Sequence, residues 1–490
     1  MVVLYNPPSS ANRKPVLPFS LLALGALLEG KTPYQIVDGN LEPDPLDALD
    51  RAIQEREALY LGVTVMPGPQ LAAADSHCQE IRRRHPRTRI VWGGYFPTQH
   101  YDVCLRDGPV DFVVRGHGER AFADLVARAP NQGDPESIPG LVYRQAAAAT
   151  TIPTPLPPLP DPEFLPDFPY HRIDMRRYVR NTFMGRTLSH HSSYGCPFFC
   201  NFCAVVNMVN GRWKAQSAER TARITRQLAE DYQLDAIEFF DNNFFVDQSR
   251  VAEFCERIMD LRIRWWGEAR IDTLLAFSDS TWEKMARSGL TMVFLGAESG
   301  SDETLRRMQK GGRASVDKTL SIAQKMASYD IIPEFSFVLG NPPHPEKDTE
   351  ETLRFIRRVK KVNPASEIVL YLYTPVPLAG ELYDSARRAG FSMPDGLAAW
   401  TSREGQELAL RRSGNLPWVS GRLHRRLRNF ERVLNAYYPT QTDTRLQGVW
   451  RLVLKTISSW RYHSRLYHFP IELRALQRWV GYQRPETSGF

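Results

Sequence analysis

Several features that the sequence lacks narrow the class of protein. It has no run of 18 apolar residues, so we expect no membrane-spanning helix. The first residues lack a charged segment followed by an apolar one, so we expect no signal peptide and a cytoplasmic location. Six cysteines among 490 residues are too few for a disulfide scaffold, and no fixed-period repeat occurs. One hydrophobic core cannot hold 490 residues, so we expect two or three domains.

Composition is ordinary for a globular protein, with 42% hydrophobic and 24% charged residues. The net charge of +7 indicates either an anionic partner or a generally basic surface. An anionic partner could be nucleic acid, a membrane surface or a phosphorylated substrate.

Residues 1–145 alternate short apolar segments with helical patterns, which predicts an open parallel α/β sheet. In such sheets ligands bind beyond the carboxyl ends of the strands. The predicted strands are 2–5, 34–37, 59–63, 90–92 and 111–114, and the helices lie at about 18–30, 44–55, 69–83 and 117–128.

Residues 146–185 are predicted to be a stiff linker, because residues 151–170 include eight prolines. From 186 to 400 the alternation resumes and predicts a partial (β/α)6 barrel with its site at the strand carboxyl ends. One of its helices is expected to start at Asp348 with a capping box to Glu351. Residues 401–490 are predicted to be helical and packed. The barrel strands are expected at 187–193, 236–241, 264–269, 292–297, 334–339 and 368–374.

The most informative segment is a three-cysteine loop directly after the first barrel strand. Cys196, Cys200 and Cys203 have the spacing Cys-x3-Cys-x2-Cys, which lets three thiolates bind three irons of one cubane and leaves the fourth iron open. A zinc site is the alternative, with His190 or His191 as a further ligand.

This loop resembles the signature of the radical S-adenosylmethionine (SAM) superfamily. In that family the open iron chelates SAM, and one electron cleaves SAM to a 5′-deoxyadenosyl radical that removes a substrate hydrogen. The segment Asp241-Asn242-Asn243 departs from the family's frequent Gly-Gly-Glu triplet. The resemblance implies SAM contacts at Phe202, Asp241, Asn242, Arg270, Glu298 and Ser299.

Residues 1–145 resemble the cobalamin-binding domain that precedes the barrel in one subgroup. The Asp-x-His-x-x-Gly motif that supplies a histidine to cobalt is absent, since Asn40 follows Asp38-Gly39. His100 or His117 could replace it, and a degenerate domain without cobalamin is the alternative. Contacts to cobalamin are implied at Pro8, Asp38, Gly39, Thr64, Gly93, Gly94, Tyr95, Phe96, Gly116, His117, Gly118 and Glu119.

The resemblance implies a cobalamin-dependent radical SAM enzyme that methylates an unactivated carbon of a small-molecule or lipid-like substrate. Its cofactors would be a 4Fe-4S cluster, SAM and cobalamin, and its electron donor flavodoxin or ferredoxin. A cyclase or ring-rearranging enzyme, a tRNA methylthiotransferase and a non-catalytic cobalamin sensor are the alternatives. The methylthiotransferase would need a second cysteine trio, which Cys78 and Cys104 cannot make. We therefore do not expect a nucleic-acid partner, whereas peripheral membrane contact is compatible with the charge.

Overall fold

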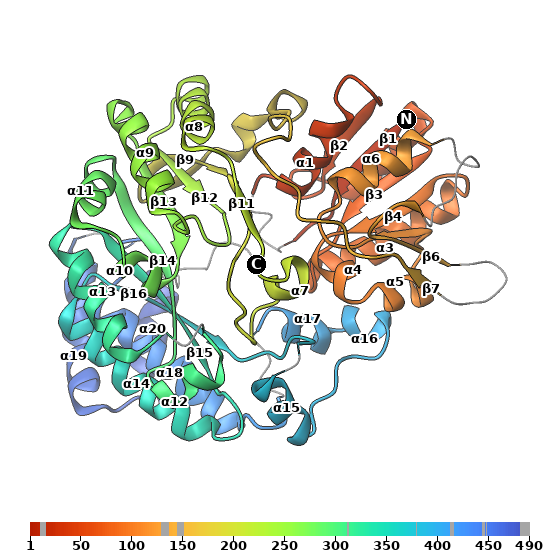
Figure 1. Ribbon diagram of the computed structural model, residues 1–490. Coiled ribbons are helices and arrows are strands. Elements are labelled where there is room, and N and C mark those ends of the chain that lie inside the picture. The colour runs from red at the N-terminus through yellow and green to blue at the C-terminus, as the bar shows by residue number, and fades with distance from the viewer. Residues whose placement is uncertain are drawn as a thin grey trace.

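The computed structural model describes residues 1–9, 16–128, 137–144, 151–310, 313–378, 380–411, 416–442, 446 and 448–480. Two bodies, each built on a sheet, lie side by side, and the last helices pack on the second body (Figure 1). Among the described residues, no helix has the length and apolar character needed to cross a membrane.

The first body is a seven-stranded sheet in the order β2-β1-β3-β4-β5-β6-β7. Its strands up to β5 are parallel, and β6 and β7 are antiparallel additions. Successive residues of β1 enter separate hydrophobic cores on the two faces, so this inner strand is apolar from Val2 to Tyr5. The strands are β1 (Val2–Asn6), β2 (Tyr34–Asp38), β3 (Tyr60–Thr64), β4 (Arg89–Gly93), β5 (Phe112–Val114), β6 (Leu141–Arg144) and β7 (Thr151–Pro153).

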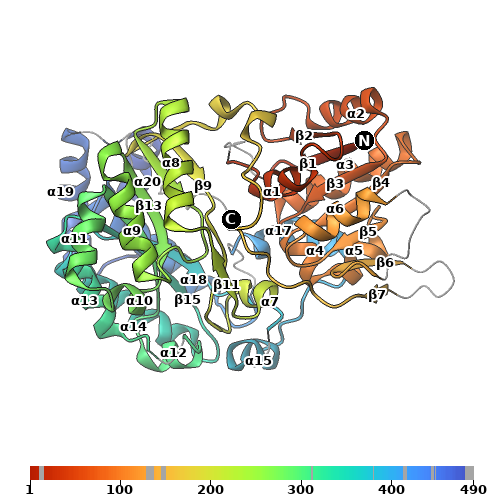
Figure 2. The same ribbon diagram turned by 45° about the horizontal axis from the view of Figure 1, so that its top comes forward.

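Helices cover both faces of this sheet (Figure 2). All four helical segments expected from the sequence are present. Two short helices, α4 and α5, were not expected, because each is too short to give a clear helical pattern in the sequence. The helices are α1 (Phe19–Leu28), α2 (Pro45–Arg56), α3 (Pro69–Arg84), α4 (Tyr95–Gln99), α5 (Tyr101–Asp107) and α6 (Glu119–Ala127).

The proline-rich segment is tied to both bodies. At one end β7 pairs with β6, and at the other β8 (Arg180–Thr182) pairs with the first barrel strand. In between, Tyr178 donates a hydrogen bond of 2.8 Å to Asp38 of the first sheet. The segment is thus an extended connection that contributes an edge strand to each sheet.

The second body is a curled sheet in the order β16-β15-β14-β13-β12-β9-β8, parallel except for β8. The six parallel strands are those expected, so the predicted partial barrel is confirmed. Their outer faces pack under helices around Trp265, Phe239 and Phe335. The strands are β9 (Gly185–His190), β12 (Ala236–Phe239), β13 (Arg264–Ala269), β14 (Leu290–Glu298), β15 (Ile332–Leu339) and β16 (Glu367–Leu372).

The helix expected from Asp348 begins earlier. Helix α14 (Pro345–Val362) has Pro345 at its first position, where proline is favoured because no backbone donor is needed. The Asp348 carboxylate therefore does not cap the helix. It accepts hydrogen bonds from Ser299 and Asn341 and so holds the loop after β14. The other barrel helices include α8 (Ala218–Tyr232), α9 (Gln248–Ile258), α11 (Asp279–Arg287), α12 (Asp302–Arg307) and α13 (Val316–Ser328).

After the barrel the chain crosses back to the first body. Helices α16 (Leu397–Thr401) and α17 (Arg403–Ala409) follow α15 (Glu381–Arg388), and Trp400 packs edge-on against Phe96 at 5.3 Å. Asp107 accepts a hydrogen bond from the backbone of Leu397. These helices therefore pack on the first body, against α3 and α5, although they follow the barrel in sequence.

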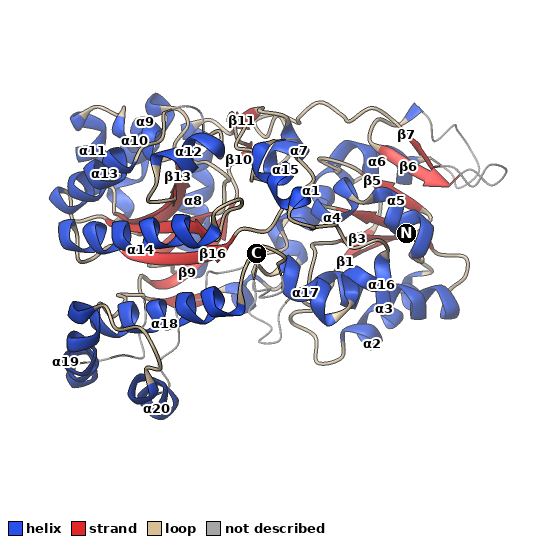
Figure 3. Cartoon of the chain, turned by 90° about the horizontal axis from the view of Figure 1, so that it is seen from below, coloured by secondary structure: helices blue, strands red, loops and turns tan. Residues whose placement is uncertain are grey.

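Helices α18 (Gly421–Tyr437), α19 (Val449–Ser464) and α20 (Ile471–Val480) form a separate layer against the barrel (Figure 3). Leu423, Leu427, Phe430 and Leu434 lie on the buried face of α18, as the prediction of a helical and packed region requires. Arg357 of α14 lies 4.2 Å from the ring of Tyr462, and Glu367 accepts hydrogen bonds from Gln441 and Thr442. The layer is therefore anchored to α14 and to the start of β16.

Candidate radical SAM and cobalamin site

The cysteine loop is held by a short hairpin. Strand β10 (Ser193–Gly195) pairs with β11 (Trp213–Ala215), and helix α7 (Val205–Val209) closes the loop between them. Gly195 has φ of +81°, and a Cβ there would lie 2.2 Å from the carbonyl oxygen of Arg212. Only glycine fits directly before Cys196, so the hairpin fixes where the loop begins.

The three thiols lie close together in poorly solvated surroundings. Cys200 is buried, and Cys196 and Cys203 are half-buried. Burial raises the pKa of all three thiols, of Cys203 to about 12, and the charge of Cys200 further raises the pKa of both neighbours. A raised pKa means that deprotonating these thiols costs free energy. A bound cluster would offset that cost, because iron binds the thiolate form.

These thiols fit a cubane cluster. No three His, Cys, Asp or Glu side chains among the described residues converge on one ion position. In a cubane each cysteine binds a different iron, so the three sulfur atoms stand farther apart than the ligands of a single ion. His190, one of the two histidines considered for zinc, has both ring nitrogens occupied, by Tyr170 and Gln216.

Arg270 clamps the cysteine loop to the end of β13. Its guanidinium donates to the Cys200 sulfur at 3.3 Å and lies 3.8 Å from the ring of Phe198. Two further N–H groups donate to the buried carboxylate of Asp272, and one to the carbonyl oxygen of Lys310. Most of the five donors are thus used within the protein.

Lys310 extends this clamp to the end of β14. Its ammonium lies 2.7 Å from the carboxylate of Glu298, and both side chains are buried. Glu298 has φ of +66° at a bulge in β14, an unusual conformation for a residue with a side chain. Glu298 was expected from the sequence, whereas Lys310 was not, because it lies on a loop outside any motif.

We expect Arg270→Lys to lower the rate of 5′-deoxyadenosine formation at least tenfold, about 1.4 kcal/mol in the barrier. Lysine keeps the charge but cannot bridge Asp272, Cys200 and Phe198 at once. Iron content and product formation are measured together, with Arg264→Lys at the exposed start of β13 as the control. An unchanged rate in the Arg270 variant would show that the clamp has no role in the reaction.

Asp241, Asn242 and Asn243 follow β12 and have different surroundings. Asp241 is buried and accepts from the backbone and hydroxyl of Ser192 and from the hydroxyl of Ser193. It thereby holds the start of the cysteine hairpin. Asn242 is exposed.

Asn243 was not among the SAM contacts expected from the sequence. It is buried, and its amide lowers the pKa of the Cys196 thiol. Neither amide atom has a hydrogen-bond partner in the described structure. A buried amide that faces the cluster position without a partner fits contact with a polar cofactor.

Two further predicted SAM contacts are part of the packing. Phe202 is half-buried against the barrel core. Ser299 is buried, donates to Asp348 and accepts from the backbone of Ser301. Its hydroxyl thus shapes the loop after β14.

On the first body, Asp38 is the centre of a buried network. It accepts from Asn6, Asn40 and Tyr178. A Cβ on Gly39 would lie 2.8 Å from the ring of Pro8, so this turn needs glycine. Thr64, at the end of β3, accepts a hydrogen bond from Ser20.

The predicted cobalamin contacts in the loop after β4 have different surroundings. Gly94 has φ of +100°, and a Cβ there would lie 3.3 Å from Thr64 and Val65, whereas Gly93 has more room. Tyr95 is half-buried, and Phe96 is fully buried in the core. The nitrogen of Gly116, after β5, is tied to Thr98. These loops meet at one edge of the sheet, as expected.

The residues after β5 contact the cysteine hairpin. The His117 ring lies 4.7 Å from the ring of Tyr194, and Gly118 precedes α6 closely packed on Val114. His117 Nδ1 lies 3.6 Å from Glu119, whose buried carboxylate also has an oxygen without a partner in the described structure. This cluster joins the predicted cobalamin edge to the residue two positions before Cys196.

A second set of contacts joins the same two regions. Asn207 of α7 donates to Gln99 of α4 at 3.1 Å. Burial raises the pKa of the neighbouring Tyr95, and the charge of Cys203 adds to this shift. His100 packs against Phe96 and Trp400 instead, and burial lowers its pKa to about 4. The carboxyl edges of the two sheets therefore meet at the cysteine loop.

The inner face of the barrel carries carboxyls in neighbouring strands. Glu268, Phe294, Glu334 and Glu367 lie in register from β13 to β16. Glu238 pairs with Arg180, and Glu367 is held by Thr442. Glu268 and Glu334 are half-buried, and burial raises the pKa of each to about 8. The nearby carboxylate of Asp241 adds to the shift of Glu268, and those of Glu367, Glu268 and Glu238 to that of Glu334.

We expect Glu334→Gln to flatten the pH dependence of stability. Between the unfolded pKa of 4.5 and the folded value of about 8, the folded protein keeps a proton that the unfolded chain has lost, so stability falls as pH rises. Glutamine removes this loss. The fall in Tm from pH 6 to pH 8 should shrink by about 2–5 °C. Exposed Glu230→Gln is the control, and equal slopes for both variants would contradict the assignment.

A parallel half-barrel whose first strand leads into a three-cysteine loop, joined to an open α/β sheet, defines a radical SAM protein with a second cofactor domain. The sequence model of the Radical SAM superfamily matches residues 191–356. That of the B12 binding domain matches residues 14–126.

Known proteins resemble the chain over most of its length. It is 25% identical to an uncharacterized methyltransferase, PH0819, of Pyrococcus horikoshii, over 73% of this chain and 78% of that protein. It is 26% identical to an anaerobic magnesium-protoporphyrin IX monomethyl ester cyclase of Synechocystis, over 65% and 64%. The structure of TsrM from Kitasatospora setae, a radical SAM methyltransferase with cobalamin and a 4Fe-4S cluster bound, matches in fold with a TM-score of 0.64. That match has 18% identity and covers 79% of this chain and 75% of TsrM.

Residues 191–356 thus match the Radical SAM superfamily and residues 14–126 the B12 binding domain, and the chain is an enzyme that resembles cobalamin-dependent radical SAM methyltransferases. Its cofactors are a 4Fe-4S cluster, SAM and cobalamin.

Proposed function

We propose that this enzyme methylates an unactivated carbon of a small-molecule or lipid-like substrate. The observation that supports this most is the position of the cysteine loop, where the carboxyl edges of both sheets meet. Asn207 of α7 donates to Gln99 of α4, and the ring of His117 lies 4.7 Å from that of Tyr194. A substrate at this junction would be reached from both sides, and such proximity makes capture of a carbon radical selective.

The roles of the chain's own residues follow from their contacts. Cys196, Cys200 and Cys203 would hold the cluster, and Arg270 with Lys310 would keep the loop at the ends of β13 and β14. We assign Asp241 and Ser299 as positioning residues, because their polar atoms are bonded within the protein. Phe202, Asn242 and Glu298 remain the proposed SAM contacts, and we add Asn243, whose buried amide has no hydrogen-bond partner in the described structure.

The first sheet would hold the corrinoid at its carboxyl edge. The proposed contacts there are the turns of Pro8 with Gly39, Thr64, Gly93 with Gly94, and Gly116 with Gly118, together with the side chains of Tyr95, His117 and Glu119. Asp38 and Phe96 would support these turns from within. The corrinoid, when bound, supplies a carrier for the methyl group of SAM.

The buried His100 packs on Trp400 and is therefore not assigned to cobalt.

We propose flavodoxin or ferredoxin as the electron donor, and a cytoplasmic location because such donors act there. The decisive experiment uses SAM labelled in its methyl group and measures whether the label appears in the product. A cyclisation without methyl transfer is the second candidate, supported by the similarity to the Synechocystis cyclase.

A further inference from the structure

The positive charge of the chain is concentrated at its C-terminal end. Residues 401–490 contain 16 arginines and lysines against six acidic residues, whereas the net charge of the whole chain is only +7. Only one of the 16 is a lysine. Arginine binds phosphate and carboxylate groups through two parallel hydrogen bonds, so this composition favours an anionic partner.

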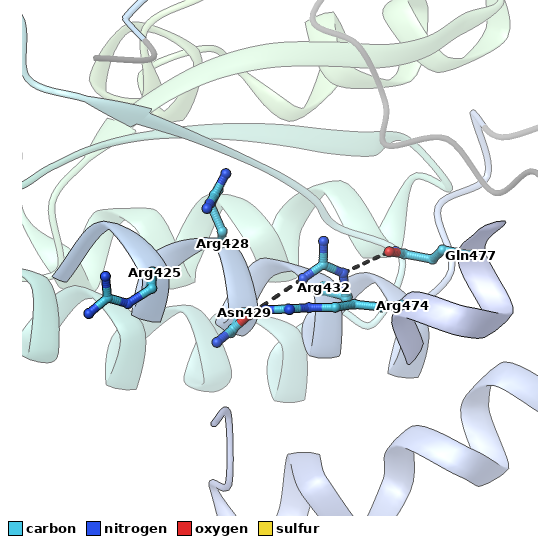
Figure 4. A pocket seen from close by; sticks show the side chains of 6 residues that line it. All are labelled: Arg425, Arg428, Asn429, Arg432, Arg474 and Gln477. Carbon is cyan, nitrogen blue, oxygen red and sulfur yellow. Dashed lines mark hydrogen bonds between the residues drawn. The ribbon is translucent and has the colours of Figure 1, made fainter. Parts of the chain in front are cut away.

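Four of these arginines line one cavity of about 490 Å³ between α18 and α20 (Figure 4). Arg432 donates to Gln477 at 2.7 Å, and Arg474 to Asn429 at 3.3 Å. The lining consists of arginine and amide side chains, without a carboxylate among the described residues. The cavity therefore offers positive charge, and two of its arginines, Arg432 and Arg474, donate to amide groups of the lining. Its lining is Arg425, Arg428, Asn429, Arg432, Arg474 and Gln477.

The helices next to this cavity expose apolar side chains. Seven of the twelve exposed large hydrophobic residues in the described structure lie within 449–471. Val449, Leu452 and Trp460 lie on one side of α19, opposite its buried residues. Phe469 and Ile471 are 73% and 67% exposed, and Ile471 lies one turn before Arg474 on α20. The exposed apolar residues and the arginine cavity therefore both include residues of α20.

This exposure is built into the fold. Arg461, itself buried, donates to the carbonyl oxygens of Leu466, His468 and Phe469 and forms an ion pair with Glu472. The ring of Tyr467 packs edge-on against Phe430 at 5.0 Å. The turn between α19 and α20 is thus fixed with Phe469 pointing outward.

We propose that α18–α20 form a docking surface for membranes that contain anionic phospholipids. Arginines and exposed aromatic and aliphatic side chains on one layer are the combination that binds the membrane interface. A soluble anion would account for the arginine cavity alone, whereas a lipid phosphate in the cavity also brings acyl chains to Phe469 and Ile471. The layer lies outside the barrel, so the surface does not depend on the proposed reaction (Figure 3).

Vesicle flotation of the full-length reconstituted enzyme tests this proposal. We expect binding to vesicles of equal parts phosphatidylcholine and phosphatidylglycerol, and at least tenfold weaker binding to phosphatidylcholine alone. Arg428→Glu with Arg474→Glu, and separately Phe469→Ser with Ile471→Ser, should each weaken binding at least tenfold. The matched control is Arg306→Glu with Arg403→Glu, at two exposed positions outside the layer. It should retain more than half of the vesicle binding of the parent protein.

Circular dichroism and SAM cleavage verify that each variant is folded. No binding to the anionic vesicles at low salt would overturn the proposal. Loss in the arginine variant with no change in the Phe469 and Ile471 variant, together with competition by inorganic phosphate, would assign the cavity to a soluble anion instead. An equal loss of vesicle binding in the matched control would show that only the net charge matters, and this result would also overturn the proposal.

Discussion

Replacing Cys196, Cys200 and Cys203 together by alanine is expected to abolish the iron–sulfur cluster and all SAM cleavage. The three thiols are the only ones at the carboxyl end of the barrel in the described structure, and each would bind one iron. Absorbance of the anaerobically reconstituted protein, iron content and 5′-deoxyadenosine formation should all fall to background. Secondary structure should persist, because the hairpin of β10 and β11 and the barrel core do not depend on these sulfur atoms.

Cys104→Ala is the matched control. This thiol is also buried but lies on α5 in the first body, so its loss should cost about 1 kcal/mol of stability and leave the cluster intact. Stoichiometric zinc in the parent protein, without iron-dependent activity, would contradict the cluster assignment. Full SAM cleavage by the triple variant would do so as well.

With SAM labelled in its methyl group, we expect the label in the product. One SAM donates its methyl group and becomes S-adenosylhomocysteine. A second SAM accepts one electron, is cleaved to methionine and a 5′-deoxyadenosyl radical, and yields 5′-deoxyadenosine on taking a substrate hydrogen. The two nucleoside products should therefore form in about equal amounts.

The same enzyme prepared without cobalamin provides the control. Labelled product and S-adenosylhomocysteine should fall to background, whereas 5′-deoxyadenosine should still form, because the cysteine loop is built by the barrel alone. If the cobalamin-loaded enzyme makes product without label or S-adenosylhomocysteine, methylation is wrong. Cyclisation or rearrangement would then be the better account.

Local patterns were sufficient for the two sheets. Alternating apolar strands and helices predicted all five parallel strands of the first sheet and all six of the barrel. Because both faces of a parallel strand are buried, its consecutive residues are apolar, and such short apolar runs can be recognised in the sequence. The start of α14 was misplaced because Asp348 with Glu351 looks like a cap, while the preceding Pro345 actually begins the helix.

The contacts of several site residues could not be predicted, because they are made between separate elements of the fold. Arg270 reaches Cys200, and Lys310 reaches Glu298, through turns that only the folded barrel brings together. Asp241 sits among serines of the cysteine hairpin, which shows its positioning role only in three dimensions. Trp400 packs on Phe96 although the two are 304 residues apart.

The sequence by itself determined the cysteine loop, the parallel sheets and the cofactors that they imply. Each depends on spacing within a few residues, which chain connectivity preserves. Only the tertiary structure decided that the carboxyl edges of the two sheets meet, with His117 against Tyr194 and Asn207 against Gln99. It also decided which acids are paired, as Glu298 is with Lys310, and which are not. Such contacts depend on how separate elements pack, and the free energy of that packing is shared among many residues rather than carried by a motif.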